Sequence, residues 1–342
     1  MKTKVNNKIL SLIKADISES SFVYLNDMLS EVDGLFKELF ACSDSCEMSS
    51  HIYGTLTNGG KRLRPLLLSL SSKFGDANDE EIIKLMSTIE LIHTASLVHD
   101  DIVDKSSMRR NQPTINSEKG DAYAARCGFE MIATSLELLS DCDKDEILDI
   151  IANIPMQMCY GELEQFDVEF SCNSLTEDNY YARIKQKTAS LIQGSCLIGA
   201  LSSSVDKNIL SALSDYGLAI GQLFQIRDDL LDYENTPIDG KPISQDIERG
   251  IYTLPIIFTL NTLSADSKYE AEHKKFLFVL EKRKKTNTEI QYIIDTTRSM
   301  GGIDYARKVV KNEAAKALSS LKALPKSDYR EVLASIVNLL AS

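Results

Sequence analysis

Apolar residues recur every three or four positions along almost the whole chain. Leu85, Ile89 and Ile92 form one such stripe, which Ser96 and Asp100 continue with a small and an acidic residue. This spacing places side chains on one face of an α-helix, and runs that alternate with period two are nearly absent. Most prolines stand where helices are expected to start or in loops. The pattern predicts an all-α fold of about a dozen helices.

No linker-like Gly, Ser or Pro stretch, fixed repeat or low-complexity run divides the helical pattern. The chain has 342 residues, of which 43% are hydrophobic and 26% charged, and this is enough to bury a sizeable core. We therefore expect residues 1–342 to form a single all-α domain, a large helical bundle.

The charge and the cysteine content narrow the classes of function and location. A formal net charge of −12 argues against a protein that coats nucleic acid, so any bound anion must meet a local basic cluster. The seven cysteines form no CxxC pair and suit a reducing compartment better than a disulfide framework. The N-terminal residues lack a signal-peptide core, and no window has the length of a membrane span. We expect a soluble cytoplasmic protein with no nucleic-acid partner and no transmembrane segment.

Two acidic motifs of the same form stand far apart in the sequence. Residues 100–104 read DDIVD at the end of a helical pattern that begins near Asp79, and residues 228–232 read DDLLD at the end of another. The first and last aspartates of each motif share a helix face, so their carboxylates repel unless solvent or a cation separates them. Chance gives two such motifs in only about a hundredth of chains this acidic. Because Mg²⁺ prefers one or two carboxylates plus substrate phosphates, the motifs predict a metal site that a shared phosphorylated ligand completes.

Positive charge is clustered beside the acidic motifs. Residues 59–65 read GGKRLRP, in which the glycines let backbone amides approach a phosphate while Lys61 and Arg64 reach the same face. His93 lies almost two helical turns before Asp100 and therefore on nearly the same face. Further basic residues near the motifs are Arg109, Arg110 and Lys187. These clusters predict that cations hold the phosphorylated ligand.

Together these segments resemble the polyprenyl synthetase family, the trans-type isoprenyl diphosphate synthases, over about residues 59–255. The similar motifs are, in chain order, GGKRLRP at 59–65, ELIHTASLVHDDIVD at 90–104, MRRNQPT at 108–114, GELEQ at 161–165, KTA at 187–189, GQLFQIRDDLLD at 221–232, GKPISQD at 240–246 and TLP at 253–255. The resemblance implies a bundle around a deep central cavity, with the helices that end in Asp104 and Asp232 facing each other. It also implies a long-chain polyprenyl diphosphate synthase with magnesium as cofactor, about three ions per site.

The resemblance assigns roles to individual residues. The diphosphate of isopentenyl diphosphate would be held by Lys61, Arg64, His93 and Arg110. The allylic diphosphate would be held by Arg109, Lys187, Thr188, Gln225 and Lys241. The magnesium ions would be coordinated by Asp100, Asp104 and Asp228, supported by Asp101, Asp229 and Asp232. The residues that carry catalysis would be Asp100, Asp104, Asp228, Lys187 and Arg109.

Such a site has no unusual nucleophile or general base, so electrostatic stabilisation of the departing diphosphate must drive the reaction. Four residues depart from the family pattern. Asn111 and Ser244 stand where glycine is usual, Phe129 where an acidic residue is common, and Ile251 where a lysine usually adds a phosphate contact. The metal-binding aspartates are intact, which favours an active enzyme.

Two other classes remain open. A terpene cyclase shares the helical cavity and an acidic metal motif, but it leaves Lys61, Arg64 and His93 without a role. A subunit of a hetero-oligomeric prenyl synthase, with weak or no activity alone, is supported by the four departures. An assay of the purified chain with magnesium, isopentenyl diphosphate and an allylic primer separates these classes.

Small residues near the predicted site bear on the length of the product. Ala95 and Ser96 lie about one turn before Asp100, and Gly217 and Gly221 lie about two turns and one turn before Gln225. Small side chains here favour a cavity with an open floor and therefore a long product. Ile92 and Phe129 are the candidate residues that would end chain growth. The alternative is that the small residues only permit close helix packing. The resemblance implies a homodimer, and the apolar patterns over 22–40 and 122–139 agree with it because they carry more apolar surface than one bundle buries. We also expect transient membrane contact for product release.

Overall fold

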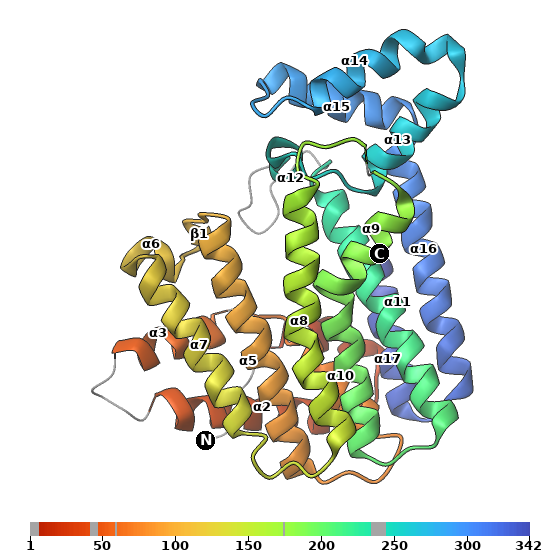
Figure 1. The fold of residues 1–342 in the computed structure, drawn as a ribbon. Coiled ribbons are helices and arrows are strands. Elements are labelled where there is room, and N and C mark those ends of the chain that lie inside the picture. Colours follow the sequence, from red (N-terminus) through yellow and green to blue (C-terminus); the bar gives the residue numbers. More distant parts are fainter. Residues whose placement is uncertain (1–6, 42–46, 59, 174, 234–243) are drawn as a thin grey trace. The chain divides into compact units, whose positions relative to one another are not determined.

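The computed structural model describes residues 7–41, 47–58, 60–173, 175–233 and 244–342, and it is mainly α-helical (Figure 1). One two-stranded pairing is the exception in this part of the chain, so the predicted all-α class is confirmed. The chain divides into two compact units. The first comprises Met1–Pro155, Leu191–Gly217 and Ala317–Leu339, and the second Met156–Ser190, Leu218–Lys316 and Leu340–Ser342. The single-domain assignment of residues 1–342 stays a prediction.

The first unit contains α1 (Lys8–Ile13), η1 (Lys14–Asp16), α2 (Glu19–Phe40), α3 (Glu47–Thr57), α4 (Leu63–Ser72), α5 (Asp79–Val103), β1 (Met108–Arg109), β2 (Gln112–Pro113), α6 (Ile115–Lys119), α7 (Asp121–Glu137) and η4 (Leu321–Ala323). The second contains α9 (Glu177–Ile184), η2 (Lys185–Ala189), α12 (Gln245–Arg249), α13 (Leu254–Ala265), η3 (Ser267–Tyr269), α14 (Glu270–Leu280) and α15 (Asn287–Ser299). Both units have residues in α8 (Asp145–Asp167), α10 (Ser190–Ser202), α11 (Lys207–Leu231), α16 (Gly302–Ser320) and α17 (Asp328–Ala341). In the described part of the chain, no helix combines the length and the apolar character that crossing a bilayer requires.

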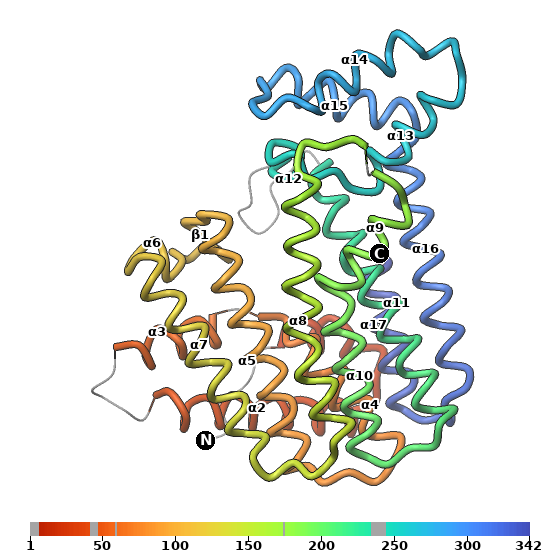
Figure 2. The backbone as a smooth tube through the Cα atoms, in the orientation of Figure 1, coloured from red at the N-terminus to blue at the C-terminus, as the bar shows by residue number. Residues whose placement is uncertain are grey.

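Helix α5 is the central helix of the first unit and carries the first acidic motif at its C-terminal end. It begins where the sequence predicts, because the side chain of Asn78 accepts a hydrogen bond from the backbone N–H of Glu80 and acidic residues fill the first turn. Helices α2, α4 and α7 pack against it, and Figure 2 shows α5 and α7 running side by side. Residues 85–92 are buried around the whole helix. The motif is therefore held at the end of a rigid, buried stem.

The strands β1 and β2 form a tight hairpin directly after α5. Arg109 pairs with Gln112, so the hairpin turns through Arg110 and Asn111. These two residues have φ angles of 52° and 61°, as a two-residue turn with the twist of a hairpin requires. Asparagine tolerates this left-handed conformation better than most residues, which explains how Asn111 can replace the family's glycine. This departure is compatible with an intact site.

Two glycines bring long helices close to the π-helical turn η2 in the second unit. A Cβ atom added to Gly221 of α11 would lie 2.5 Å from Cα of Ala189, and one added to Gly161 of α8 would lie 2.7 Å from the backbone nitrogen of Lys187. Only glycine permits these approaches. Single π-helical turns are often found at functional sites, and this one carries Lys187 and Thr188.

Candidate active site

Arg64 and His93 form the centre of a basic cluster in the first unit. Nη1 of Arg64, in the first turn of α4, donates a hydrogen bond of 2.9 Å to Nε2 of His93 on α5. Because a guanidinium can only donate, a neutral His93 carries its proton on Nδ1. His93 Nδ1 and Arg64 Nε are both buried, and neither has a hydrogen-bond partner among the described residues. Buried donors are normally satisfied, so this pair fits an oxygen-rich anion such as a diphosphate.

The pKa values of Arg64 and His93 are both lowered, which means that their surroundings disfavour positive charge and would favour an incoming anion. Burial, reinforced by the guanidinium groups of Arg64 and Arg110, holds the pKa of His93 well below its usual value. Burial also lowers the pKa of Arg64 to about 10, with Glu90 opposing the shift and Arg110 adding to it. At neutral pH His93 is therefore uncharged and Arg64 charged.

The stability of the protein should fall as the pH drops below about 6.5, the pKa of an unfolded histidine. Below this pH, His93 is protonated in the unfolded state but neutral in the folded state. The free energy of unfolding therefore decreases by up to about 1.4 kcal/mol per pH unit. Urea unfolding of the wild type and His93→Gln between pH 8 and 5.5 measures this slope. His51→Gln, on α3 of the same unit, is the control. An unchanged slope in His93→Gln would contradict the buried, neutral state.

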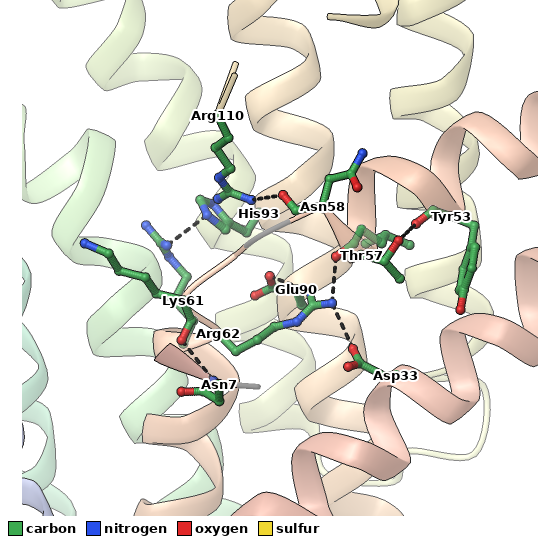
Figure 3. Close-up of polar contacts among 12 residues, drawn as sticks. Asn7, Asp33, Tyr53, Thr57, Asn58, Lys61, Arg62, Glu90, His93 and Arg110 are labelled. Carbon is green, nitrogen blue, oxygen red and sulfur yellow. Dashed lines mark hydrogen bonds and ion pairs between the residues drawn. The ribbon is translucent and has the colours of Figure 1, made fainter. Parts of the chain in front are cut away.

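Arg110 and Lys61 complete the basic cluster. Nη1 of Arg110 donates to the backbone oxygen of Asn58 at 3.4 Å, beside His93 (Figure 3). A Cβ atom added to Gly60 would lie 3.4 Å from the same Nη1, so Arg110 lies directly beside Gly60. Lys61 has an exposed side chain next to this group. The structure thus brings Arg110, Arg64 and His93 together, as predicted for the isopentenyl diphosphate site, whereas Gly59 lies outside the described residues.

The aspartates of the first motif differ in their surroundings. Asp101 is 5% exposed, and its two carboxylate oxygens accept hydrogen bonds of 2.8 and 2.9 Å from Nε of Arg109. Asp100 and Asp104 are partly exposed at the end of α5. The side chain of Asn116 on α6 donates to the backbone oxygen of Asp101 at 3.2 Å and holds the start of α6 to the motif. Asp101 is therefore placed to orient Arg109, a role that the sequence did not distinguish from metal binding.

A hydrogen-bonded chain surrounds the second motif in the second unit. Asp229 accepts bonds from Tyr180 Oη at 2.6 Å and from Gln225 Nε2 at 2.7 Å, and Gln225 Oε1 accepts one from Thr188 Oγ1 at 2.6 Å. Asp229 is 4% exposed, whereas Asp228 is exposed. This series of hydrogen bonds links Asp229, Gln225 and Thr188, which were predicted for the site, to Tyr180. Tyr180 was not predicted from the sequence. Its position two helical turns before Lys187 was the available signal.

The last aspartate of the second motif also has a structural partner. Asp232 Oδ2 accepts a hydrogen bond of 2.8 Å from the backbone N–H of Asp246 at the start of α12.

Burial, and then the charge of Asp246, raise the pKa of Asp229 to about 7. A nearby cation would favour the ionised form of this carboxyl.

Lys187 forms an ion pair with Glu162. Its ammonium group lies 2.5 Å from Oε2 of Glu162, the second residue of the GELEQ motif. Gly161 allows this approach by letting α8 lie against η2. Lys241, the remaining residue predicted for the allylic diphosphate, lies outside the described residues.

The other departures from the family pattern have distinct surroundings. Ser244 has a φ of 68°, a conformation that explains the family's glycine there and that costs a serine about 1 kcal/mol. Ile251 is 7% exposed, so a lysine in its place would pay a desolvation cost. Phe129 is 64% exposed and packs its ring against His99.

The small residues near the motifs serve different purposes. A Cβ atom added to Gly217 would lie 2.8 Å from Cα of Gln193, and Gly221 is equally crowded by Ala189. These two glycines therefore permit close helix packing, as the alternative interpretation held. Ala95 is fully buried, whereas Ser96 is partly exposed. Ser96 is thus the better placed residue to influence a bound chain.

The donor set at the end of α5 fits a hard divalent cation. Among the described residues no cluster of three or more His, Cys, Asp or Glu side chains forms a preformed metal site. Mg²⁺ needs no such cluster, because it retains waters and takes phosphate oxygens from a substrate. Asp100 and Asp104 supply two carboxylates one turn apart on one helix face.

The fold and these groups define an all-α protein with two aspartate motifs and a basic cluster suited to an anionic ligand. The sequence pattern of the Polyprenyl synthetase family matches residues 46–297, and the chain belongs to this family, whose members depend on divalent metal ions. It is 31% identical to heptaprenyl diphosphate synthase component 2 of Bacillus subtilis over 338 residues, covering 95% of this chain and 94% of the relative. It is 32% identical to octaprenyl diphosphate synthase of Haemophilus influenzae over 282 residues, covering 82% of this chain and 84% of the relative.

Solved structures show the same similarity. The crystal structure of heptaprenyl diphosphate synthase from Staphylococcus aureus matches with a TM-score of 0.83 and 32% identity, covering 93% of this chain and 98% of that one. The polyprenyl synthase of Caulobacter crescentus, complexed with calcium and isoprenyl diphosphate, matches with a TM-score of 0.83 and 27% identity, covering 100% and 99%. The family assignment made from the motifs is confirmed.

Proposed function

We propose that this protein is a trans-prenyltransferase that condenses isopentenyl diphosphate with an allylic diphosphate in successive steps to make a long-chain polyprenyl diphosphate. The observation that carries the proposal is the pair of buried, unpartnered donors on Arg64 and His93 beside Arg110. This basic cluster supplies a diphosphate site in addition to the one that the acidic motifs serve. The heptaprenyl and octaprenyl diphosphate synthases among its relatives support the same activity and a long product.

The residues act by binding and by electrostatics. Arg64, His93 and Arg110, with Lys61, hold the diphosphate of isopentenyl diphosphate and direct its double bond. Arg109 and Lys187, with Thr188, Gln225 and Lys241, hold the allylic diphosphate and stabilise the charge that develops as it leaves. The carbon–oxygen bond of the allylic substrate breaks, and the electron pair leaves with the diphosphate. The double bond of isopentenyl diphosphate then forms the new carbon–carbon bond, and the released diphosphate takes the proton that is lost.

We assign the metal to the acidic motifs, with Asp100, Asp104 and Asp228 as ligands. Mg²⁺, about three ions per site, would neutralise charge on the leaving diphosphate. Asp101, Asp229 and Asp232 support the ligands by positioning Arg109, Gln225 and the start of α12 through the bonds described above.

One assay tests this function against a terpene cyclase. The purified chain is incubated with Mg²⁺ and an allylic primer, with and without isopentenyl diphosphate, and the product and released diphosphate are measured. We expect prenyl products only when isopentenyl diphosphate is present. Cyclic or alcohol products from the allylic substrate alone would instead indicate a cyclase, for which the cluster around Arg64 has no use.

A second candidate is a subunit that needs another protein for full activity. The Bacillus subtilis relative is named as component 2 of its synthase, and this name is the observation that favours the alternative. The chain assayed alone would then show little turnover, although it would still bind isopentenyl diphosphate through the basic cluster.

We propose a single functional domain over residues 1–342 that acts in the cytoplasm as a homodimer. The second half of α8 supports self-association, because Met156, Tyr160, Leu163 and Phe166 are all about half exposed or more. Sedimentation at micromolar concentration should therefore give a dimer, and Leu163→Glu should shift it towards monomer. Transient membrane contact would allow a long apolar product to leave.

A further inference from the structure

Arg62 is an unusual residue at the start of α4. It is the N-cap of this helix and adopts the left-handed conformation, with φ 47° and ψ 34°, although it is not glycine. Such a conformation persists in a side-chain-bearing residue only where its surroundings enforce it. Arg62 stands between Lys61 and Arg64, two residues that bind diphosphate in the proposed function.

The side chain of Arg62 is buried and bonded from three helices. Nη1 donates to Oε1 of Glu90 on α5 at 2.7 Å, and Nη2 donates to Oδ1 of Asp33 on α2 at 2.9 Å. Nη2 also donates to the backbone oxygen of Leu56 on α3 at 2.6 Å. The guanidinium lies 5.3 Å from the ring centre of Phe36, and the residue is only 8% exposed. Figure 3 shows the guanidinium of Arg62 between Glu90 and Asp33.

This network turns Arg62 away from the substrate site. Its Nη1 and Nη2 already face two carboxylates and a carbonyl, so it is not a further phosphate ligand. Although burial opposes it, the charges of Glu90 and Asp33 raise the pKa of Arg62, so the group stays charged. A buried charge is tolerated only with such partners, which therefore fix its position.

The network is linked directly to the residues around the buried donors. Glu90 precedes His93 by three positions on α5 and shares its face. The contacts from Arg62 to Glu90 and from Arg64 to His93 are thus successive connections between the start of α4 and α5. Before Arg62, the backbone oxygen of Lys61 accepts a bond of 3.1 Å from Nδ2 of Asn7. The turn that carries Lys61 and Arg64 is therefore held on both sides.

We propose that Arg62, with Asp33 and Glu90, is a positioning residue that sets the affinity for isopentenyl diphosphate by holding Lys61 and Arg64 in place. This inference rests on the proposed function. Arg62 does not touch the substrate, and its loss acts through the turn. The KM for isopentenyl diphosphate should rise, while the KM for the allylic substrate, which other residues hold, should change little.

The experiment compares Arg62→Ala, Arg62→Gly and Asp33→Asn with the wild type in steady-state assays in which each substrate is varied in turn. We expect the KM for isopentenyl diphosphate to rise about tenfold in both Arg62 variants and less in Asp33→Asn, with the allylic KM within about twofold. Glycine accepts the left-handed backbone, so Arg62→Gly should unfold at a higher temperature than Arg62→Ala but bind equally poorly. A normal KM in Arg62→Gly would overturn the inference.

A matched control separates positioning from general loss of stability. Leu70→Ala removes a buried side chain later in the same helix, and it should lower the melting temperature without changing the ratio of the two KM values. Thermal shift on adding isopentenyl diphosphate without Mg²⁺ gives a readout that needs no turnover, and it should shrink in the Arg62 variants. An equal rise of both KM values in the Arg62 variants would mean a purely structural role. A wild type that does not use isopentenyl diphosphate would instead defeat the proposed function.

Discussion

Replacing Asp100 with alanine is expected to lower turnover by about a thousandfold or more. Asp100 is partly exposed at the end of the buried helix α5, one turn from Asp104, and it is the first carboxylate of the proposed metal site. Without it the departing diphosphate loses compensation for its charge. The measurement is the release of diphosphate at saturating substrates and Mg²⁺.

The control for this variant is Glu130→Gln, which removes one exposed acidic charge from α7 of the same unit. It should retain near-normal turnover, and the melting temperature of each variant shows whether it is folded. Raising the Mg²⁺ concentration should restore little activity to Asp100→Ala, because its ligand set is incomplete. If Asp100→Ala keeps a near-normal rate, the metal site lies elsewhere.

Replacing Ser96 with phenylalanine is expected to shorten the product to a short-chain prenyl diphosphate. Ser96 lies one turn before Asp100 on α5 and is partly exposed, and its hydroxyl donates to the backbone oxygen of His93 at 2.8 Å. A phenyl ring at this position would block the growing apolar chain about one helical turn away from the metal-binding aspartates. The reaction itself should continue, since no group that binds diphosphate is removed.

Mass spectrometry of the extracted products measures this change. Ser96→Ala should give the wild-type product, because it adds no bulk. Ala95→Phe is expected to destabilise the fold by about 1–3 kcal/mol, because Ala95 is fully buried and the core has no room for a ring. A wild-type product distribution from folded Ser96→Phe would show that the chain grows along another path.

Much of the site could be predicted because its residues lie close together in the sequence. Helical periodicity located α5 with its start at Asp79, and spacing of four placed Asp100 and Asp104 on one face. The local motif GGKRLRP indicated a phosphate-binding turn, and Arg64 indeed meets His93. These features depend on helical geometry and on short-range order, both of which a sequence encodes directly.

Contacts between distant segments could not be predicted in the same way. From the sequence, Asp101 and Asp229 had only a general supporting role at the metal site, and the fold shows that one is paired with Arg109 and the other with Tyr180. The sequence favoured a role for Gly221 in widening a cavity, but its close packing against Ala189 shows that it lets two helical segments approach each other. Which partner a side chain meets depends on how helices pack, and periodicity carries no information about that.

Helical spacing and local motifs were enough to identify the fold class and the family and to predict which residues bind substrate. The tertiary structure was needed to distinguish the exposed Asp228 from the buried Asp101 and Asp229, and to show that Arg62 joins Asp33 and Glu90. The physical reason is that the partners of a buried charged side chain decide its role. A buried charge whose donors are bonded within the protein, as in Arg62, positions its neighbours, whereas one that keeps a buried donor with no partner among the described residues, as in Arg64, can bind a ligand, and these partners meet only when distant helices come together.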